Sequence, residues 1–435
     1  MRILIGTTPL PGHVNPFTTL AKALLGAGHE VLWYTGHSFA DQVTALGATF
    51  LPFDQALEYD TQALNTIFPK RRQYQGLDHI KFDLRKIFID NLEGQTVDLL
   101  ALCRDHQPDV VLSDTGLLGA IATCSHLQLP LAICNVTALM VSDPTIAPFG
   151  FGRLPNNSYL GRLQNRFLYW FCETFVLADI HQAVNEILTA LRMSPLNYAL
   201  FDVPIYMPDL FLQPTTPRFE YPRSNLPNAC HFIGPIFPTF PSPFDPPAWW
   251  PELTTNRPVV LVTQGTMTTE PQQLILPTIQ ALANEDVLVI VTTANRAVSE
   301  LGPLPSNVRA EPFIPYNRLL PQLDLIVTNG GYGTVQMALA HGVPLVVAGK
   351  TEEKAEIGAR VTWAEVGLDL KTNYPKPRQI RRAVSHILNA PKYKRNAQYV
   401  ACDMAGYDAP QQTVALIEQL VNHRASTPIS ESHIV

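Results

Sequence analysis

Short apolar runs alternate with stretches of helical periodicity along the first half of the chain. Runs rich in Val, Ile and Leu are typical of strands buried on both faces, and apolar residues three or four apart are typical of helices packed on them. This alternation predicts a mostly parallel sheet with helices on both faces. We expect strands at residues 2–5, 30–35, 50–52, 110–113 and 131–135, and helices at residues 15–25, 39–46, 97–104 and 118–126.

The same alternation restarts in the second half, after a segment crowded with prolines. Because proline fixes φ and lacks an N–H donor, we expect an extended connector within residues 204–258. Strands are expected again at residues 259–263, 287–292 and 308–311, and a helix at residues 271–283. A chain of 435 residues is long enough for two α/β domains, placed at residues 1–235 and 258–405 with a proline-rich linker at 236–257. Such domains leave a cleft between facing strand ends, where ligands of parallel sheets bind.

Residues 324–350 combine a strand, a glycine-rich turn, a helix and a second strand. The apolar run at residues 325–327 leads into Asn329, Gly330 and Gly331, and a helix is expected from Thr334. Such a turn presents backbone N–H groups and the positive end of the helix dipole, which together bind phosphate. Close packing of a helix on its strand produces the same pattern, so both interpretations stay open. No Lys-Ser or Lys-Thr pair follows the glycines, which argues against a P-loop.

Composition and charge narrow the classes of function. The chain is 46% hydrophobic and 16% charged with a net charge of −6, which argues against a nucleic-acid partner or an anionic membrane surface. The six cysteines are scattered, with no C-x-x-C pair, and are expected to be reduced. The N-terminal MRILIGTTPLPGH is interpreted as a first strand, not a signal peptide, so we expect a cytoplasmic protein.

One segment is unusually rich in aromatic side chains. Residues 159–180, YLGRLQNRFLYWFCETFVLADI, come closest to a membrane-spanning run, but four charged residues interrupt them and no transmembrane segment is expected. The first interpretation is an amphipathic helix whose apolar face completes the core. The alternatives are a wall of an apolar ligand site and a peripheral membrane contact.

Two titratable residues follow strands of the first half. His13 lies past the first strand and before the helix expected from Asn15, and Asp114 directly follows the strand at residues 110–113. Parallel strands end at one edge of the sheet, so we expect the two side chains to emerge there. A carboxylate bonded to one imidazole nitrogen leaves the other free to accept a proton from a hydroxyl. The alternatives are a cap or packing role for His13 and an N-cap near Leu118 for Asp114.

Together these motifs resemble family 1 glycosyltransferases. The segments PGHVNP, Asp114 after its strand, VTQGT and FIPYNRLLPQLDLIVTNGGYGTVQMALAHGVPLV occur in the family's order, and the resemblance covers residues 1–421. It implies a GT-B fold with two Rossmann-like domains and a cleft between them. It also implies inverting transfer of a sugar from a nucleotide diphosphate and a last helix, residues 406–424, that crosses back to the first domain. His13 would be the general base and Asp114 its orienting partner.

The resemblance also implies donor contacts in the second half. They are Thr266 at the diphosphate, Phe313 stacked on the base in place of a tryptophan, and the backbone of Gly331, Tyr332, Gly333 and Thr334 around the phosphates. The nucleotide diphosphate sugar would be a co-substrate. We expect no metal, because no carboxylate cluster is evident and the N–H groups with the helix dipole can stabilise the leaving group.

The chain departs from the family pattern at several of these positions. Asn329 stands where the family has a histidine that touches phosphate, and Met337 replaces the glutamate that binds the ribose hydroxyls, with Gln336 beside it. Glu353 and Lys354 replace the acidic-plus-glutamine pair that contacts sugar hydroxyls. Without a carboxylate at Met337 the case for a 2′-hydroxyl contact weakens, so a UDP-sugar and a dTDP-sugar are both candidate donors.

The predicted function is therefore sugar transfer to a hydroxyl of a small acceptor. The aromatic segments at residues 148–151 and 167–175 favour an apolar acceptor. One rival is a nucleotide-sugar epimerase, which would need acid and base groups on both faces of the sugar. Another is a non-catalytic nucleotide-sugar-binding protein, which Asn329 and Met337 favour.

Overall fold

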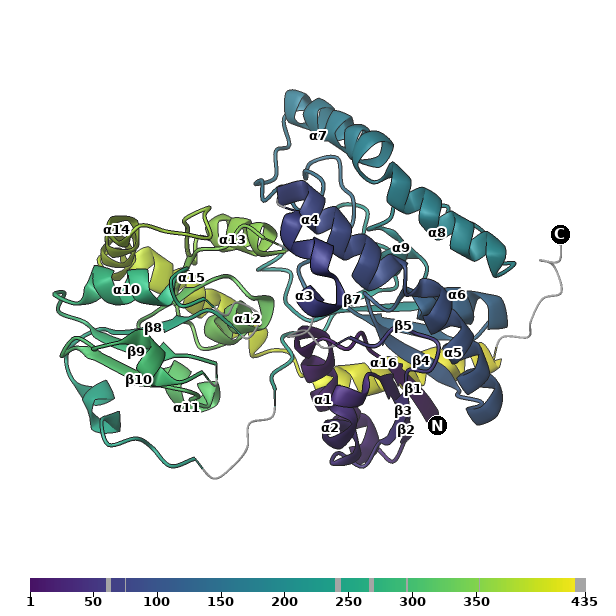
Figure 1. Ribbon diagram of the computed structural model, residues 1–435, viewed down its shortest axis with the longest axis horizontal. Helices are drawn as coiled ribbons and strands as arrows, with labels where there is room; N and C mark the ends of the chain where they lie inside the picture. The colour runs from purple at the N-terminus through teal and green to yellow at the C-terminus, as the bar shows by residue number, and fades with distance from the viewer. Residues whose placement is uncertain are drawn as a thin grey trace.

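The computed structural model describes residues 1–59, 64–74, 76–238, 244–265, 270–294, 296–351 and 353–426. Within these ranges the chain forms two α/β units side by side, each built on a parallel sheet (Figure 1). The predicted fold class, two Rossmann-like domains, is therefore confirmed.

The first sheet has seven parallel strands in the order β3-β2-β1-β4-β5-β6-β7. Gly6 pairs with Ser113, so β1 and β4 end side by side at the middle of the sheet. The residues that follow these two strands therefore meet at one edge. The strands are β1 (Arg2–Gly6), β2 (Glu30–Thr35), β3 (Thr49–Pro52), β4 (Val110–Asp114), β5 (Leu131–Cys134), β6 (Leu210–Gln213) and β7 (Cys230–Phe232).

Helices surround this sheet and fill the connections between its strands. They are α1 (Pro11–Gly26), α2 (Ala40–Thr44), α3 (Leu64–Ile67), α4 (Gly76–Asp83), α5 (Leu92–His106), α6 (Leu118–Leu127), α7 (Tyr159–Phe171), α8 (Ala178–Ala190) and α9 (Val203–Tyr206). The first of them begins earlier than the sequence pattern predicts, at Pro11 instead of Asn15. Proline is favourable at the first helical position, where its missing N–H has no intrahelical partner to lose.

Two strands lie inside the segment predicted to be an extended connector, and that prediction is wrong for them. All four residues of β6 are buried, and β7 pairs with β6 at the edge of the sheet. Both strands are short, and the prolines around them obscure the apolar run. The connection between the domains therefore begins only after Phe232.

The second sheet has six parallel strands in the order β10-β9-β8-β11-β12-β13. Its strands are β8 (Val259–Thr263), β9 (Leu288–Thr292), β10 (Val308–Glu311), β11 (Leu325–Thr328), β12 (Leu345–Val347) and β13 (Gly367–Asp369). The helices are α10 (Ile275–Leu282), α11 (Tyr316–Leu319), α12 (Tyr332–Ala340), α13 (Lys354–Trp363), α14 (Pro377–Leu388), α15 (Pro391–Met404) and α16 (Ala409–Ser426). The last of these leaves the second domain and packs on α1 and β6, with Ile417 in the first domain's core.

The aromatic segment forms α7 and α8, joined by a π-helical turn at Cys172–Val176. The α8 helix packs into the core through residues such as Ile180 and Val184. The prediction that the apolar face completes the core is wrong for α7. Its buried residues are Gly161 and Asn165, and most of its large apolar side chains are exposed, with Leu168 and Tyr169 only partly buried.

A buried ionic contact joins the two domains. Arg360 of α13 is fully buried, with Nε 2.8 Å from Oε2 of Glu220 in the first domain and Nη1 3.1 Å from Oε2 of Glu356. Its Nη2 also donates to the carbonyl oxygen of Leu139 at 2.9 Å. Burial alone would lower the pKa of the guanidinium, but Glu220 and Glu356 raise it, so Arg360 remains charged. This contact fixes the second domain against the first.

Candidate active site

The structure brings His13 and Asp114 together at the carboxyl end of the first sheet. Nδ1 of His13 lies 2.9 Å from Oδ1 of Asp114, across 101 residues of sequence. The carboxylate is completely buried, whereas the His13 side chain retains 17% exposure. The imidazole therefore has one edge on the carboxylate and is reachable from solvent.

Asp114 is held by donors from two loops. Its Oδ2 accepts from the backbone N–H of Thr8 at 2.5 Å, and its Oδ1 accepts from the hydroxyl of Thr8 at 3.1 Å and from the N–H of Gly116 at 2.5 Å. Burial alone would raise the pKa of this carboxyl, but His13 and the N–H donors outweigh it and lower the pKa. Asp114 therefore stays ionised inside the protein.

Sequence reasoning missed Thr8 and Gly116 as supports of this carboxylate. A β-carbon at Gly116 would lie 2.8 Å from the Thr8 hydroxyl and 3.0 Å from Oδ1 of Asp114, so only glycine fits there. The spacing Asp114-x-Gly116 is typical of a turn in which an aspartate side chain accepts from the N–H two residues later. This spacing could have indicated Gly116 as a support of the carboxylate.

The geometry fixes the tautomer of a neutral His13. An ionised carboxylate only accepts hydrogen bonds, so Nδ1 must carry the proton and Nε2 is left as an acceptor. The predicted position of His13 in a loop is wrong, because the residue lies in the first turn of α1. The cap alternative for Asp114 is also wrong, since the N-cap of α6 is Leu117 and makes no side-chain cap.

The glycine-rich turn joins β11 to α12 at the carboxyl end of the second sheet. Gly330 has φ of +89°, a left-handed conformation that favours glycine, and Gly331 is the N-cap of α12. A β-carbon on Gly333 would meet nothing within 4 Å. The first-turn N–H groups of Tyr332, Gly333 and Thr334 have no partner within the helix, so this open turn can bind an anion.

The opposite face of the same helix contacts the first domain. The Tyr332 hydroxyl accepts from Nε2 of Gln213 at the end of β6, at 3.0 Å, and one turn later Oε1 of Gln336 accepts from the Thr215 hydroxyl at 3.1 Å. Burial raises the pKa of Tyr332, so its phenol stays protonated. Oε1 of Gln336 is thus bonded across the domain contact, while its Nε2 is buried and has no hydrogen-bond partner among the described residues.

Asn329 and Lys354 line one cavity beside the turn, of about 250 Å³ including its open mouth. The Asn329 amide donates to the carbonyl oxygen of Gln264 and thereby ties the turn to the loop after β8. Lys354 is the first residue of α13, and Glu353 occupies the N-cap position before it. The structure thus places a cation beside the asparagine that stands where the family has histidine.

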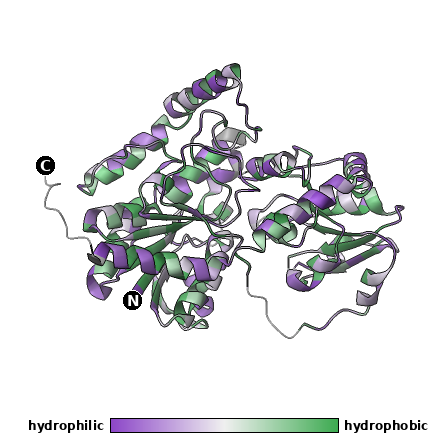
Figure 2. Ribbon diagram, turned by 180° about the vertical axis from the view of Figure 1, so that it is seen from behind, coloured by the Kyte–Doolittle hydropathy of each residue, from purple (hydrophilic) through white to green (hydrophobic). Residues whose placement is uncertain are grey.

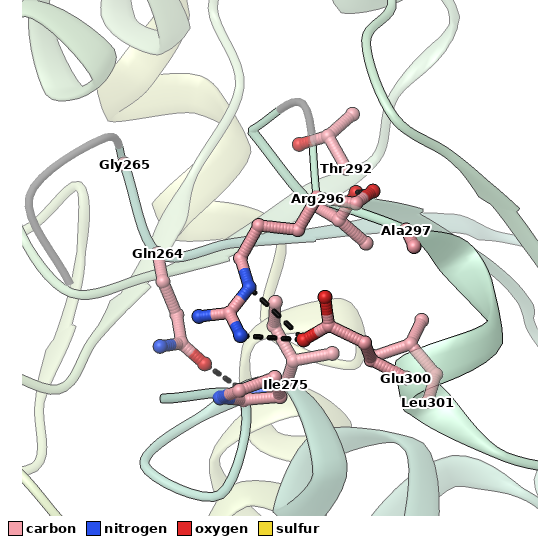
Figure 3. Close-up of a pocket in the computed structure, with 10 residues that line it drawn as sticks. Gln264, Gly265, Ile275, Thr292, Arg296, Ala297, Glu300 and Leu301 are labelled. Atoms are coloured by element: carbon pink, nitrogen blue, oxygen red, sulfur yellow. Dashed lines mark hydrogen bonds and ion pairs between the residues drawn. The ribbon is translucent and has the colours of Figure 1, made fainter. Parts of the chain in front are cut away.

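A second cavity of about 310 Å³ lies at the ends of β8 and β9 (Figure 3). Arg296 and Glu300 form an ion pair on its wall, while Oε1 of Gln264 accepts from the backbone N–H of Ile275. Phe313 follows the neighbouring strand β10, and its ring is 45% exposed. The order β10-β9-β8-β11 places this cavity between Phe313 and the glycine-rich turn. Thr266 lies outside the described residues.

No group of three or more His, Cys, Asp or Glu side chains that could hold a metal ion occurs in the ranges the structure describes. No described helix is long and apolar enough to cross a membrane.

Known proteins match this chain along its length. Residues 276–420 match the family described as "Erythromycin biosynthesis protein CIII-like, C-terminal domain". The 4'-demethylrebeccamycin synthase of Lentzea aerocolonigenes is 41% identical over 97% of this chain and 99% of that protein. UDP-glycosyltransferase 2 of Phaeomoniella chlamydospora is 31% identical over 96% of this chain and 95% of that protein.

Solved structures share the fold at lower identity. The calicheamicin glycosyltransferase CalG4 is 20% identical, with a TM-score of 0.75 over 98% of this chain and 99% of that one. The glycosyltransferase VinC, solved in complex with dTDP, is 20% identical, with a TM-score of 0.69 over 97% of this chain and 100% of that one. The two-domain architecture is therefore that of the GT-B glycosyltransferases.

The identity of the relatives over the full length settles the class. The chain belongs to the family of UDP-glycosyltransferases, as its resemblance implied, and it is a glycosyltransferase that takes its sugar from a nucleotide donor. The epimerase and non-catalytic alternatives are thereby set aside.

Proposed function

We propose that this enzyme is an inverting glycosyltransferase in which His13 is the general base for a hydroxyl acceptor. The observation that carries the proposal is the 2.9 Å contact of His13 Nδ1 with the buried Asp114 carboxylate. This contact leaves Nε2 as the basic nitrogen, on an imidazole that solvent reaches. A hydroxyl of the acceptor donates to Nε2 and becomes a nucleophile.

The reaction is a single displacement. The acceptor oxygen attacks the anomeric carbon, its proton passes to Nε2 of His13, and the bond to the nucleotide diphosphate breaks with its electrons on the leaving phosphate oxygen. Attack opposite the leaving group inverts the anomeric configuration. General-base assistance of about 10² to 10⁴ corresponds to roughly 3 to 5.5 kcal/mol of barrier, and Asp114 stabilises the imidazolium that forms.

The second domain holds the donor. The first-turn N–H groups of α12 stabilise the diphosphate, and Lys354 supplies the positive charge that Asn329 lacks. Phe313 stacks on the base, Thr266 contacts the diphosphate, and Glu353 lies on the side of the donor sugar. Met337 offers no carboxylate to a ribose 2′-hydroxyl, so dTDP-sugars serve alongside UDP-sugars. The complex of VinC with dTDP supports this range.

The acceptor is a small natural product with an apolar body. Relatives named for rebeccamycin and calicheamicin support that class. Phe88 lies beside His13, with ring centroids 6.2 Å apart, and gives the site an apolar wall at the base.

The test uses purified protein with UDP-glucose or dTDP-glucose and a panel of polycyclic, macrocyclic and steroidal alcohols. Acceptor-dependent nucleotide release and a β-linked product from the α-configured donor are expected, with NMR reading the configuration. An α-linked product would contradict inversion. Turnover with UDP-glucose but none with dTDP-glucose would contradict the proposed donor range and leave the base untouched.

A further inference from the structure

Helix α7 carries its hydrophobic face on the outside of the molecule. Gly161 and Asn165, one turn apart, face the protein, and the Asn165 amide donates to the carbonyl oxygen of Pro144 at 3.1 Å. The side chains on the opposite face are large, apolar and 42% to 77% exposed: Tyr159, Leu160, Leu163, Phe167, Trp170 and Phe171. Normal amphipathic packing is reversed in this helix.

The exposed residues form one continuous surface, which we call the α7 patch (residues 159–175). Phe167 lies 5.6 Å from Trp170 between ring centroids, and Phe175 of the following turn, 61% exposed, lies 5.4 Å from Trp170. Figure 1 shows α7 at the outer edge of the first domain, with no other labelled element beyond it, and Figure 2 shows the helix from behind. A continuous exposed surface of large aromatic and aliphatic side chains marks an interaction site.

The charged side chains of α7 are all basic, opposite in sign to the net charge of the whole chain. Arg162 and Arg166 are exposed on α7, at one flank of the apolar stripe, and the helix holds no acidic residue. Glu173, in the turn that follows, is half-buried, and burial raises the pKa of its carboxyl. The net charge of −6 therefore does not describe this surface.

We infer that the α7 patch docks on an anionic lipid bilayer. A helix with Trp, Phe and Leu on one face and arginines at its flank lies in the membrane interface, with the apolar face among the acyl chains and the arginines at anionic headgroups. A second copy of the chain fits this surface less well. A two-fold contact would pair the face with itself and bring the arginines of the two copies together.

Helix α14 provides the internal contrast. It also carries exposed arginines, Arg378 and Arg382, but its apolar residues Ile380 and Val384 are buried in the second domain. A surface of this kind offers charge without an apolar face. It therefore supplies control substitutions that alter the net charge by the same amount.

The test is flotation of the full-length protein with vesicles of phosphatidylcholine, with or without phosphatidylglycerol. We expect binding that requires phosphatidylglycerol. Replacement of Phe167 and Trp170 by Ser should weaken it roughly ten-fold or more. Arg162→Gln with Arg166→Gln should weaken it about five-fold per arginine, the factor given by about 1 kcal/mol per basic residue near an anionic surface. Tyr399→Ser, at a distant residue that is 58% exposed, and Arg378→Gln with Arg382→Gln should leave it unchanged.

Equal binding by the wild type and both patch variants, or no binding by the wild type, would overturn the inference. A wild-type dimer in sedimentation velocity that Phe167→Ser with Trp170→Ser converts to a monomer, with no vesicle binding, would assign the patch to a second copy instead. Sugar transfer to a soluble acceptor does not enter these readouts, so the outcome is independent of the proposed mechanism.

Discussion

The two sides of the proposed reaction centre are built in different ways. On the His13 side all the contacts lie within the first domain. The Asp114 carboxylate holds His13 and is itself fixed by the backbone N–H groups of Thr8 and Gly116. On the proposed donor side the candidate binding groups are backbone N–H groups of α12. This helix is held in place by hydrogen bonds that Tyr332 accepts from Gln213 and Gln336 accepts from Thr215, both in the first domain. The base should therefore keep its geometry when the domains move. The donor site should not.

The largest effect is expected at His13. In His13→Ala the acceptor hydroxyl has no base, so kcat should fall by about 10² to 10⁴. UDP affinity, measured by titration calorimetry, should stay within about three-fold of wild type, because the groups proposed to bind the nucleotide lie in the second domain and are unchanged. Near-native turnover on the best acceptor would show that the acceptor side needs no base.

The next largest effect is expected at the buried ion pair between the domains, and it tests whether donor binding depends on that contact. Glu220→Gln leaves the buried Arg360 with Glu356 as its remaining carboxylate, which should cost about 3 kcal/mol of stability. Denaturant unfolding measures this loss, and UDP affinity should fall with it.

A matched control is Arg381→Gln, which breaks the ion pair with Glu285, whose two side chains are 54% and 38% exposed. It should change stability by less than about 1 kcal/mol. Equal losses in Glu220→Gln and Arg381→Gln would contradict the importance of the interface.

Asp114→Asn tests the acceptor side without removing the base. The amide can donate to Nδ1 and so favour the wrong tautomer of His13, and we expect kcat to fall by about 10² with little change in donor affinity. An unchanged kcat in initial-rate assays would mean that Asp114 has only a structural role.

The same variant has a defined pH dependence. The pKa of Asp114 is lowered in the folded protein, so the unfolded state binds more protons at low pH. Its stabilising contribution is therefore fully present above the unfolded pKa of about 4 and is lost as the pH falls through the folded value. The difference in unfolding free energy between wild type and Asp114→Asn should shrink as the pH falls below about 4.

The smallest effect is expected at Tyr332. Tyr332→Phe removes one hydrogen bond between the domains, from Gln213, which should cost about 1 kcal/mol. Because α12 carries the N–H groups proposed to bind the donor, KM for the nucleotide sugar should rise a few-fold while kcat with saturating donor is kept. A change in kcat alone would place Tyr332 on the acceptor side.

Much of the fold could be predicted from the sequence because the central strands are continuous apolar runs. The expected limits agree with β2, β8 and β10 to the residue. The sequence did not reveal β6 and β7, where prolines interrupt short runs, or the outward face of α7. Periodicity shows that a helix is amphipathic, but tertiary contacts decide which face is buried.

The candidate site divides in the same way. Residues at strand ends, such as His13 and Asp114, could be placed together because the ends of parallel strands share an edge. The residues that support this site could not be predicted, because hydrogen bonds between distant segments depend on the final packing. They are Thr8 and Gly116 around Asp114, and Gln213 and Thr215 at the domain contact with α12. The sequence therefore predicts the candidate reacting groups more readily than the groups that hold them in place.

The site of protonation on His13 is the most direct test of the proposed general-base mechanism. Nitrogen-15 NMR of protein labelled at histidine, with the His13 signals assigned by their absence in His13→Gln, reports which ring nitrogen carries the proton when the imidazole is neutral. The contact with Asp114 predicts a proton on Nδ1 and an unprotonated Nε2 in the wild type, and loss of that preference in Asp114→Asn. A neutral His13 protonated on Nε2 in the wild type would contradict it, because no basic nitrogen would then face the acceptor.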